Sequence, residues 1–143
     1  VRLVGSEMCI RDRPRSERVV YCDGKADKST GKELQVYGDA NLLTLALINL
    51  IRNALQAVEG QEDGIVRVDT CAGATGHLLI TITDNGPGIP PERLSAIFTP
   101  FFSTKSGGSG IGLPISQRIM QLHGGQLSVS SIPNVRTEFR MEF

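Results

Sequence analysis

The sequence has no tryptophan and no net charge, and its three cysteines are scattered over 143 residues. Because the 15 basic and 15 acidic residues cancel, no field over the whole sequence favours nucleic acid or an anionic membrane surface, and we expect neither partner. Cys9, Cys22 and Cys71 form no C-x-x-C pair and have no metal-ligand spacing with the two histidines. Such cysteines indicate a reducing compartment, and we expect them to be small buried hydrophobic residues.

Long apolar runs are also missing. The most apolar uncharged run, Ala40 to Ile51, is shorter than the roughly 18 residues that a membrane-spanning helix needs. The composition, with 40% hydrophobic and 21% charged residues, is that of an ordinary globular domain. We expect residues 1–18 to be a non-native or disordered segment and residues 19–143 to form one domain. Residues 6–13 resemble translated sequencing-adapter readthrough, which indicates a truncated protein with a non-native start; a short native tail is the alternative.

Periodicity predicts both strands and helices. Alternating apolar and polar residues indicate strands, whereas apolar residues three and four apart indicate helices. The expected strands are 18–22, 33–37, 65–70, 77–83, 126–131 and 137–143. The expected helices are 40–58, 91–97 and 113–122. The third and fourth strands are joined by a short loop and should form an antiparallel hairpin, and Asp39 is placed to cap the first helix.

Two asparagines stand out in the first predicted helix. Asn49 and Asn53 are four residues apart, so they share one face of a helix that is apolar around most of its girth. Asparagine is a poor residue inside a helix because its amide competes with the backbone. A solvent-facing stripe that continues to Gln56 would explain the pair. Alternatively, the amide oxygens line a cleft and suit magnesium, which takes few protein ligands beside substrate phosphates.

A carboxylate and two glycines follow the fourth predicted strand. Asp84 ends that strand, Gly86 and Gly88 allow a close approach of ligand to backbone, and two prolines stiffen the turn between and after them. An ordinary turn is one interpretation of this D-x-G-x-G pattern. The other is a rigid ledge on which Asp84 accepts a hydrogen bond from a ligand N–H, such as the exocyclic amine of a purine.

A glycine-rich loop precedes the last predicted helix. Gly108, Gly110 and Gly112 lead into Leu113, and a loop of this kind at a helix N-terminus suits an anion. The pattern fits neither the Walker motif nor the dinucleotide G-x-G-x-x-G, so a flexible linker is the alternative. The aromatic run 98–102 just before it indicates either core packing or a hinged flap.

In their order, these three motifs resemble the N, G1 and G2 boxes of the GHKL superfamily, and the resemblance covers Val19 to Phe143. The stretches 49–54, 98–105 and 110–125 look like the ATP-binding catalytic domain of a sensor histidine kinase. The resemblance implies an α+β fold: a two-layer α/β sandwich of the Bergerat type, with a mixed, mostly antiparallel sheet and helices on one face. The predicted order of strands and helices agrees with such a layer pattern.

The resemblance also implies roles for individual residues and implies ATP and magnesium as cofactors. Asp84 would bind the adenine amine, supported from behind by Thr137. Asn53 would hold magnesium with Asn49 beside it, and Lys105 would neutralise a phosphate. Asn49, Asn53 and Lys105 are the catalytic residues that the resemblance implies. The nucleotide-binding residues implied are Asn53, Asp84, Gly86, Gly88, Ile89, Lys105, Gly108, Gly110, Ile111, Gly112, Leu113 and Thr137. One departure from the family pattern is the last hairpin, where 133–136 reads Pro-Asn-Val-Arg without the usual glycines.

The position of Asn49 bears on the reaction. The ATPase branches of the superfamily carry a water-activating glutamate there, so the resemblance implies transfer of the γ-phosphoryl group to a histidine and poor hydrolysis. Neither His77 nor His123 has the expected context, so the acceptor would lie on an upstream helical dimerisation domain. A response regulator would be a partner of the full-length kinase, and the domain would be cytoplasmic without membrane contact of its own. The alternatives are a GHKL serine kinase of an anti-sigma antagonist and an ATP-binding scaffold without chemistry.

Overall fold

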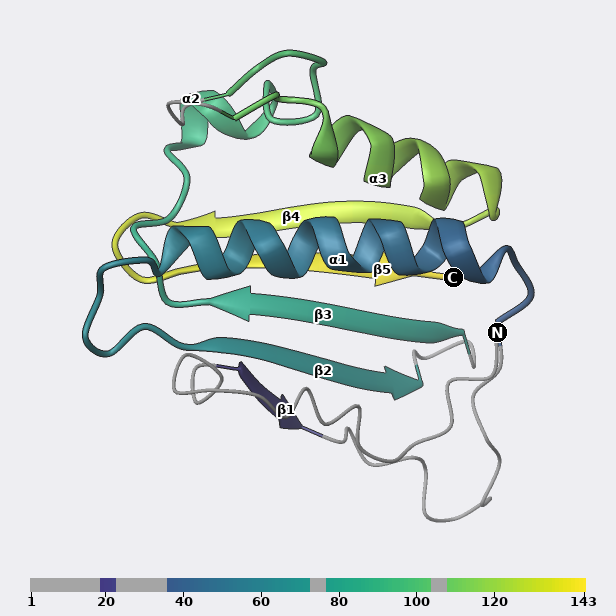
Figure 1. Cartoon of the computed structure of the whole chain (residues 1–143), viewed down its shortest axis with the longest axis horizontal. Helices are drawn as coiled ribbons and strands as arrows, with labels where there is room; N and C mark the ends of the chain where they lie inside the picture. The colour runs from purple at the N-terminus through teal and green to yellow at the C-terminus, as the bar shows by residue number, and fades with distance from the viewer. Residues whose placement is uncertain (1–18, 23–35, 73–76, 104–107) are drawn as a thin grey trace.

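Five strands in the described part of the chain form one mixed sheet in the order β1-β2-β3-β5-β4 (Figure 1). The computed structural model describes residues 19–22, 36–72, 77–103 and 108–143. Strand β1 pairs with β2 in parallel, and the other neighbours are antiparallel. The strands are β1 Val19–Cys22, β2 Val66–Ala72, β3 Leu78–Asp84, β4 Gln126–Ile132 and β5 Arg136–Glu142. The helices are α1 Ala40–Ala57, α2 Pro91–Leu94 and α3 Gly112–Leu122.

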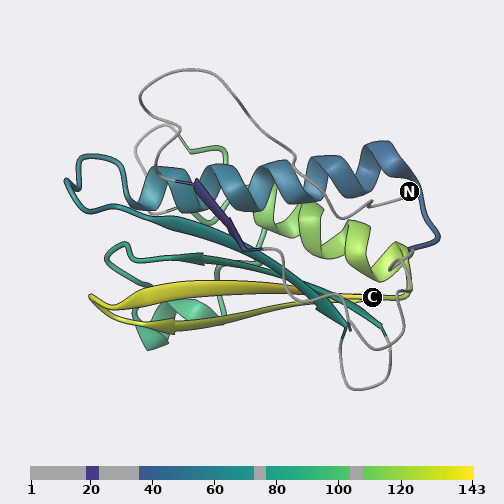
Figure 2. The same cartoon turned by 90° about the horizontal axis from the view of Figure 1, so that it is seen from below.

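The molecule has two layers. Helices α1 and α3 lie side by side and cover one face of the sheet, as Figure 2 shows edge-on. The expected two-layer α/β sandwich, with a mostly antiparallel sheet and helices on one face, is therefore confirmed.

Helix α1 forms because its start is capped and one of its faces is apolar. The Asp39 carboxylate accepts hydrogen bonds from the backbone N–H groups of Asn41, at 2.8 Å, and Leu42, at 3.0 Å. Residues at three- and four-residue spacing then face the sheet and are buried. They are Leu43, Ala46, Leu50 and Ala54, with Val58 just after the helix.

Helix α3 is closed by glycines and tied to the start of α1. Gly124 has φ +71°, and Gly125 N–H donates to the Met120 carbonyl at 2.9 Å, which is the pattern of a Schellman cap. The His123 ring accepts the Asp39 N–H at Nε2, at 3.0 Å. Its Nδ1 lies 2.7 Å from the Ile119 carbonyl, so Nδ1 carries the proton that makes this bond.

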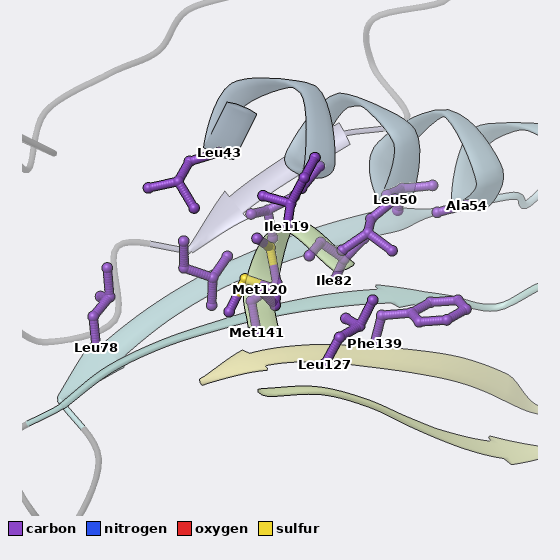
Figure 3. Close-up of a cluster of buried hydrophobic side chains, with 14 of the residues drawn as sticks. Leu43, Leu50, Ala54, Leu78, Ile82, Ile119, Met120, Leu127, Phe139 and Met141 are labelled. Carbon is purple, nitrogen blue, oxygen red and sulfur yellow. The ribbon is translucent and has the colours of Figure 1, made fainter. Parts of the chain in front are cut away.

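The core lies between the two helices and the sheet. Strands β3 and β5 send every second side chain into it, and Figure 3 shows their residues meeting those of α1 and α3. The labelled side chains are Leu43, Leu50, Ala54, Leu78, Ile82, Ile119, Met120, Leu127, Phe139 and Met141.

The other face of the sheet is polar. On β5, the Glu138 carboxylate forms ion pairs with two arginines. Arg140 Nη2 lies 2.6 Å from Glu138 Oε1, and Arg136 Nη1 lies 3.8 Å from Glu138 Oε2. A surface hollow of about 330 Å³ lies over this face, between β2, β3 and β5. The sheet therefore needs no second helical layer, because side chains that prefer water cover its open face.

Three expectations differ from the structure. The helix predicted over 91–97 is shorter, because α2 ends at Leu94. The strand predicted over 33–37 fails at its described residues, because Val36 and Tyr37 are not in a strand and Tyr37 is 93% exposed. Residues 33–35 lie outside the described part of the chain, as do residues 1–18. Cys71 is only half-buried, because the pleat of β2 turns it to the open face. Among the described residues, no helix has the length and apolarity needed to cross a membrane.

Candidate functional site

The three sequence motifs meet at one end of the two-layer structure. The C-terminal ends of α1, β3 and β4 point to the same end, and the loop before α3 returns there (Figure 1). The Asp84 motif, the amide stripe of α1 and the glycine loop are therefore brought together by topology.

Asp84 ends β3 and faces the helical layer. It is 3% exposed, and its Oδ1 accepts the Gly86 N–H at 2.9 Å, which turns the chain sharply after the strand. Gly86 lies against the end of α1: a Cβ added to it would be 2.9 Å from the Ala57 carbonyl oxygen and 3.0 Å from Ala57 Cβ. Only glycine lets the ledge approach the helix this closely.

Asn85 fixes the ledge to the opposite side of the hairpin. Its side-chain Oδ1 accepts the Ile65 N–H at 2.7 Å, and its Nδ2 donates to the Asp63 carbonyl at 2.8 Å. Sequence reasoning missed this role. The signal available was an asparagine beside two glycines, a residue that often bonds to nearby backbone.

The far end of the ledge rests on the β4–β5 turn. Asn134 N–H donates to the Pro87 carbonyl at 2.8 Å, and Asn134 itself has φ +58°. Gly88 has φ +74°, and a Cβ there would lie 2.7 Å from the Ile132 carbonyl oxygen and 2.9 Å from Pro133 Cα. Asparagine therefore takes the left-handed position in a turn that lacks the expected glycines.

Thr137 is the cross-strand neighbour of Asp84. The two residues pair in the β3–β5 register and are 4% and 3% exposed. On the other side of β5, Thr137 pairs with Ser131, and their hydroxyl oxygens are 3.1 Å apart. Ser131 also accepts the Ile89 N–H at 2.8 Å, so it contacts both the ledge and the neighbour of Asp84.

Asn49 faces the start of α3. Its Nδ2 lies 3.4 Å from both the Gly112 carbonyl oxygen and Ser116 Oγ, in long hydrogen bonds. The Ser116 hydroxyl is buried and donates to the Gly112 carbonyl at 2.9 Å. The Asn49 amide nitrogen thus holds the first turn of α3 against α1, a contact that the solvent-stripe interpretation does not foresee.

Asn53 lies on α1 between the contact of Asn49 with the glycine loop and the contact of Ala57 with the ledge. It is one turn after Asn49, which touches Gly112, and one turn before Ala57, which touches Gly86. Its side chain is half-buried and makes no hydrogen bond within the described residues, so its amide oxygen can take a ligand. The described residues hold no group of three or more His, Cys, Asp or Glu side chains suited to a metal. Magnesium fits this site only with phosphate and water as its main ligands.

The glycine loop is attached to the aromatic run. Phe101 N–H donates to the Gly110 carbonyl at 3.0 Å, and a Cβ on Gly110 would lie 2.6 Å from the backbone of Phe101. Phe98 and Phe102 pack against the core, as the core interpretation of the aromatic run expects, whereas Phe101 is 82% exposed. The hinged flap stays a prediction.

The remaining predicted residues lie around this loop. Gly108 and Ile111 are exposed, and Leu113 is half-buried against the core. Lys105 lies outside the described residues. The 330 Å³ hollow on the open face is lined by Asp84 and Asn85, among others, but not by Asn49, by Asn53 or by any residue of the glycine loop. The candidate site is therefore a convergence of residues on the helical side of the sheet, distinct from that hollow.

The comparison with protein families agrees with this geometry. Residues 38–143 match the family described as histidine kinase-, DNA gyrase B- and HSP90-like ATPases. The chain belongs to this family. It is an ATP-binding domain of the histidine kinase type, as the resemblance of its three motifs implied.

Proteins of similar sequence include a sensor histidine kinase and a transport sensor protein. The chain is 43% identical to the sensor histidine kinase ZraS of Salmonella typhimurium over 68% of this chain and 21% of that protein. It is 42% identical to the C4-dicarboxylate transport sensor protein DctB of Rhizobium meliloti over 73% of this chain and 17% of that protein. The chain thus spans about a fifth of the length of these relatives.

Solved structures share the fold. The catalytic domain of histidine kinase ThkA has a TM-score of 0.72 at 29% identity, covering 90% of this chain and 80% of that chain. The mycobacterial sensor histidine kinase MprB gives 0.72 at 30% identity, covering 90% and 85%. Full-length ShkA in complex with AMPPNP gives 0.73 at 26% identity, covering 90% and 26%.

Proposed function

We propose that this domain binds Mg-ATP beside α1 and donates the γ-phosphoryl group to a histidine on an upstream helical dimerisation domain, in two-component signalling. The observation that carries the proposal is the order of contacts along one face of α1. Asn49 contacts the glycine-loop helix, Asn53 follows with its amide available, and Ala57 contacts the Asp84 ledge. One helix face thus spans the distance between the Asp84 carboxylate, which would bind the amine, and the glycine loop, which would bind the phosphates.

The adenine would bind at the ledge. Asp84 is a buried acceptor whose position is fixed on both sides, by Asn85 and by the β4–β5 turn. Gly86, Gly88 and Ile89 would shape the pocket around the base. A fixed acceptor favours a base with an exocyclic amine over a base with a carbonyl at the same place. An Asp84 oxygen and a carbonyl oxygen of the base are both acceptors, so no proton would lie between them.

The phosphates would bind at the other end of the face. Gly108, Gly110 and Gly112, with Ile111 and Leu113, would wrap them at the N-terminus of α3, whose N–H groups favour anions. Lys105 would neutralise one phosphate. Magnesium would be held by Asn53 with phosphate oxygens and water, and would reduce the charge of the phosphates during transfer.

Asn49 gives the chain no general base for hydrolysis. A neutral amide has no useful basicity, and its nitrogen already holds Gly112 and Ser116. We therefore expect Asn49 to contribute to catalysis by holding the start of α3 beside Asn53, and not by transferring a proton. A kinase that passes its phosphoryl group to a protein benefits from this absence, since bound ATP is not lost to water.

Phosphotransfer can be tested by supplying the missing acceptor. With radiolabelled ATP and magnesium, the chain should label the helical phosphoacceptor domain of a related histidine kinase, weakly because the two domains are not tethered. The chain alone should show no steady ATP turnover. Asn53→Ala should abolish the label, whereas Glu59→Ala, an exposed residue just beyond α1, should leave it unchanged.

Two results would contradict the proposal. ATP binding without any label on the acceptor domain would identify a nucleotide-binding scaffold, and rapid hydrolysis by the chain alone would place it with the ATPases. In the parent protein we propose that this domain works in the cytoplasm, with a response regulator as the next phosphoryl acceptor.

A further inference from the structure

A buried serine links the two helices near the proposed phosphate site. Ser116 is 0% exposed and is the one polar residue among the buried residues of α1 and α3. Its hydroxyl donates to the Gly112 carbonyl at 2.9 Å, and the Ala46 carbonyl oxygen on α1 lies 3.5 Å away, at the limit of hydrogen bonding. Asn49 Nδ2 lies 3.4 Å from the same hydroxyl oxygen and 3.4 Å from the Gly112 carbonyl oxygen. A small polar cluster thus joins two helices that are otherwise held by apolar contacts.

The partners of Asn49 fix the orientation of its amide. The Gly112 carbonyl oxygen can only accept, and the single proton of the Ser116 hydroxyl already goes to that carbonyl. Both groups therefore need the amide nitrogen, whose two N–H bonds serve one partner each. With the amide turned over, its oxygen would stand against two acceptors. The Asn49 Oδ1 consequently makes no hydrogen bond within the described residues and can take a ligand.

This cluster lies where the glycine loop becomes helix α3. Gly112 is the first residue of α3, and a Cβ added to it would lie 3.7 Å from Asn49 Cγ, so the asparagine side chain rests directly on the start of the helix. A shift of the cluster would therefore move the N–H groups of the first turn of α3. At the far ends of the two helices, His123 accepts the Asp39 N–H at 3.0 Å and forms a second, separate link.

We propose that Ser116 is a positioning residue for the triphosphate: it orients the Asn49 amide and through it holds the first turn of α3 at the distance from α1 that phosphate binding needs. The inference rests on the proposed function, because it takes the glycine loop as the phosphate site. Ser116 is fully buried and would not touch the nucleotide. Without its hydroxyl, one Asn49 N–H loses its acceptor, and the amide can rotate away from Gly112. The loss should fall on the phosphates and spare the adenine at the ledge.

The test compares the dissociation constants of ATP and adenosine for the purified chain, by NMR titration with magnesium present. Both ligands carry the base and only ATP carries phosphates, so the ratio of the two constants isolates the phosphate contribution. Ser116→Ala should weaken ATP binding by about three- to tenfold, the effect of losing one hydrogen bond, and leave adenosine binding unchanged. His123→Ala is the matched control, because it removes the link at the other end of the helices and should lower stability without changing the ratio.

A double-mutant cycle tests whether Ser116 acts through Asn49. In the Asn49→Ala background, Ser116→Ala should cost much less ATP affinity than it does in the wild-type chain, because the amide that it orients is gone. Equal costs in the two backgrounds would overturn the inference.

The ratio also separates positioning from general stability, since partial unfolding weakens both ligands equally. If Ser116→Ala does not fold, Ser116→Cys gives the same comparison with a weaker donor and acceptor. A wild-type ratio in a folded Ser116 variant would overturn this inference alone, when the wild-type chain binds ATP more tightly than adenosine. Equal affinity of the wild-type chain for the two ligands would overturn the proposed phosphate site itself and the inference with it.

Discussion

Two glycines with nearly the same backbone angle should respond differently to a methyl group. Gly88 has φ +74° and Gly124 has φ +71°, so alanine at either position costs on the order of 1–2 kcal/mol of left-handed strain. A Cβ on Gly124 meets nothing within 4 Å, whereas one on Gly88 would meet the backbone of Ile132 and Pro133. Backbone atoms cannot move aside as the end of a side chain can, so the Gly88 variant carries an additional cost of about 1–3 kcal/mol.

Urea unfolding of the two variants provides the measurement. Gly88→Ala should lower the free energy of unfolding clearly more than Gly124→Ala and should also weaken ATP binding, because the ledge has to move. Equal losses in the two variants would show that the ledge does not press against the β4–β5 turn.

Individual residues show where sequence reasoning reaches its limit. Asp39 as a helix cap was predictable, because its partners lie two and three residues away. The roles of Ser131 and Ser116 were not, because both depend on which distant segments the fold brings beside them. Asn49 was singled out because asparagine is unfavourable inside a helix, but only the structure shows its nitrogen against Gly112.

At the level of single elements, the start of α1 offers a clean test. The Asp39 carboxylate holds two N–H groups of the first turn, so Asp39→Ala should lower the free energy of unfolding by about 1 kcal/mol. Asp63→Ala is a suitable control, because Asp63 is exposed and only its backbone carbonyl takes part in a hydrogen bond. Its effect should stay within about 0.5 kcal/mol. Thermal or urea unfolding measures both, and a silent Asp39 variant would contradict the capping geometry.

Elements with a long, regular pattern were predicted well. Helices α1 and α3 and strands β2 to β5 lie within two residues of their predicted bounds, because each pairs one apolar face with a clear start or end signal. The strand predicted over 33–37 alternates equally well, yet its described residues, Val36 and Tyr37, are not in a strand. Alternation shows only that a segment is suited to a sheet. Whether it forms a strand depends on whether a sheet edge is available for it to pair with.

At the scale of the whole molecule, ligand binding should stabilise the fold. ATP with magnesium at about 100 times its dissociation constant adds roughly 2.7 kcal/mol to the free energy of unfolding, because only the folded chain brings α1, the ledge and the loop together. Removing magnesium with a chelator should reduce the rise in melting temperature. Asn53→Ala should show the smaller rise with or without the metal, and a full magnesium effect in that variant would exclude Asn53 as its ligand.

The alternation of β5 makes a short surface turn intolerant of changes in length. Thr137, Phe139 and Met141 face the helices while Arg136, Glu138 and Arg140 lie on the open face, so a slip of one position would place charges in the core and move a phenylalanine out of it. Loops at the surface usually accept an inserted or deleted residue. Between Pro133 and Val135, the same change would move Thr137 out of line with Asp84, so a three-residue bend sets the spacing on which nucleotide recognition depends.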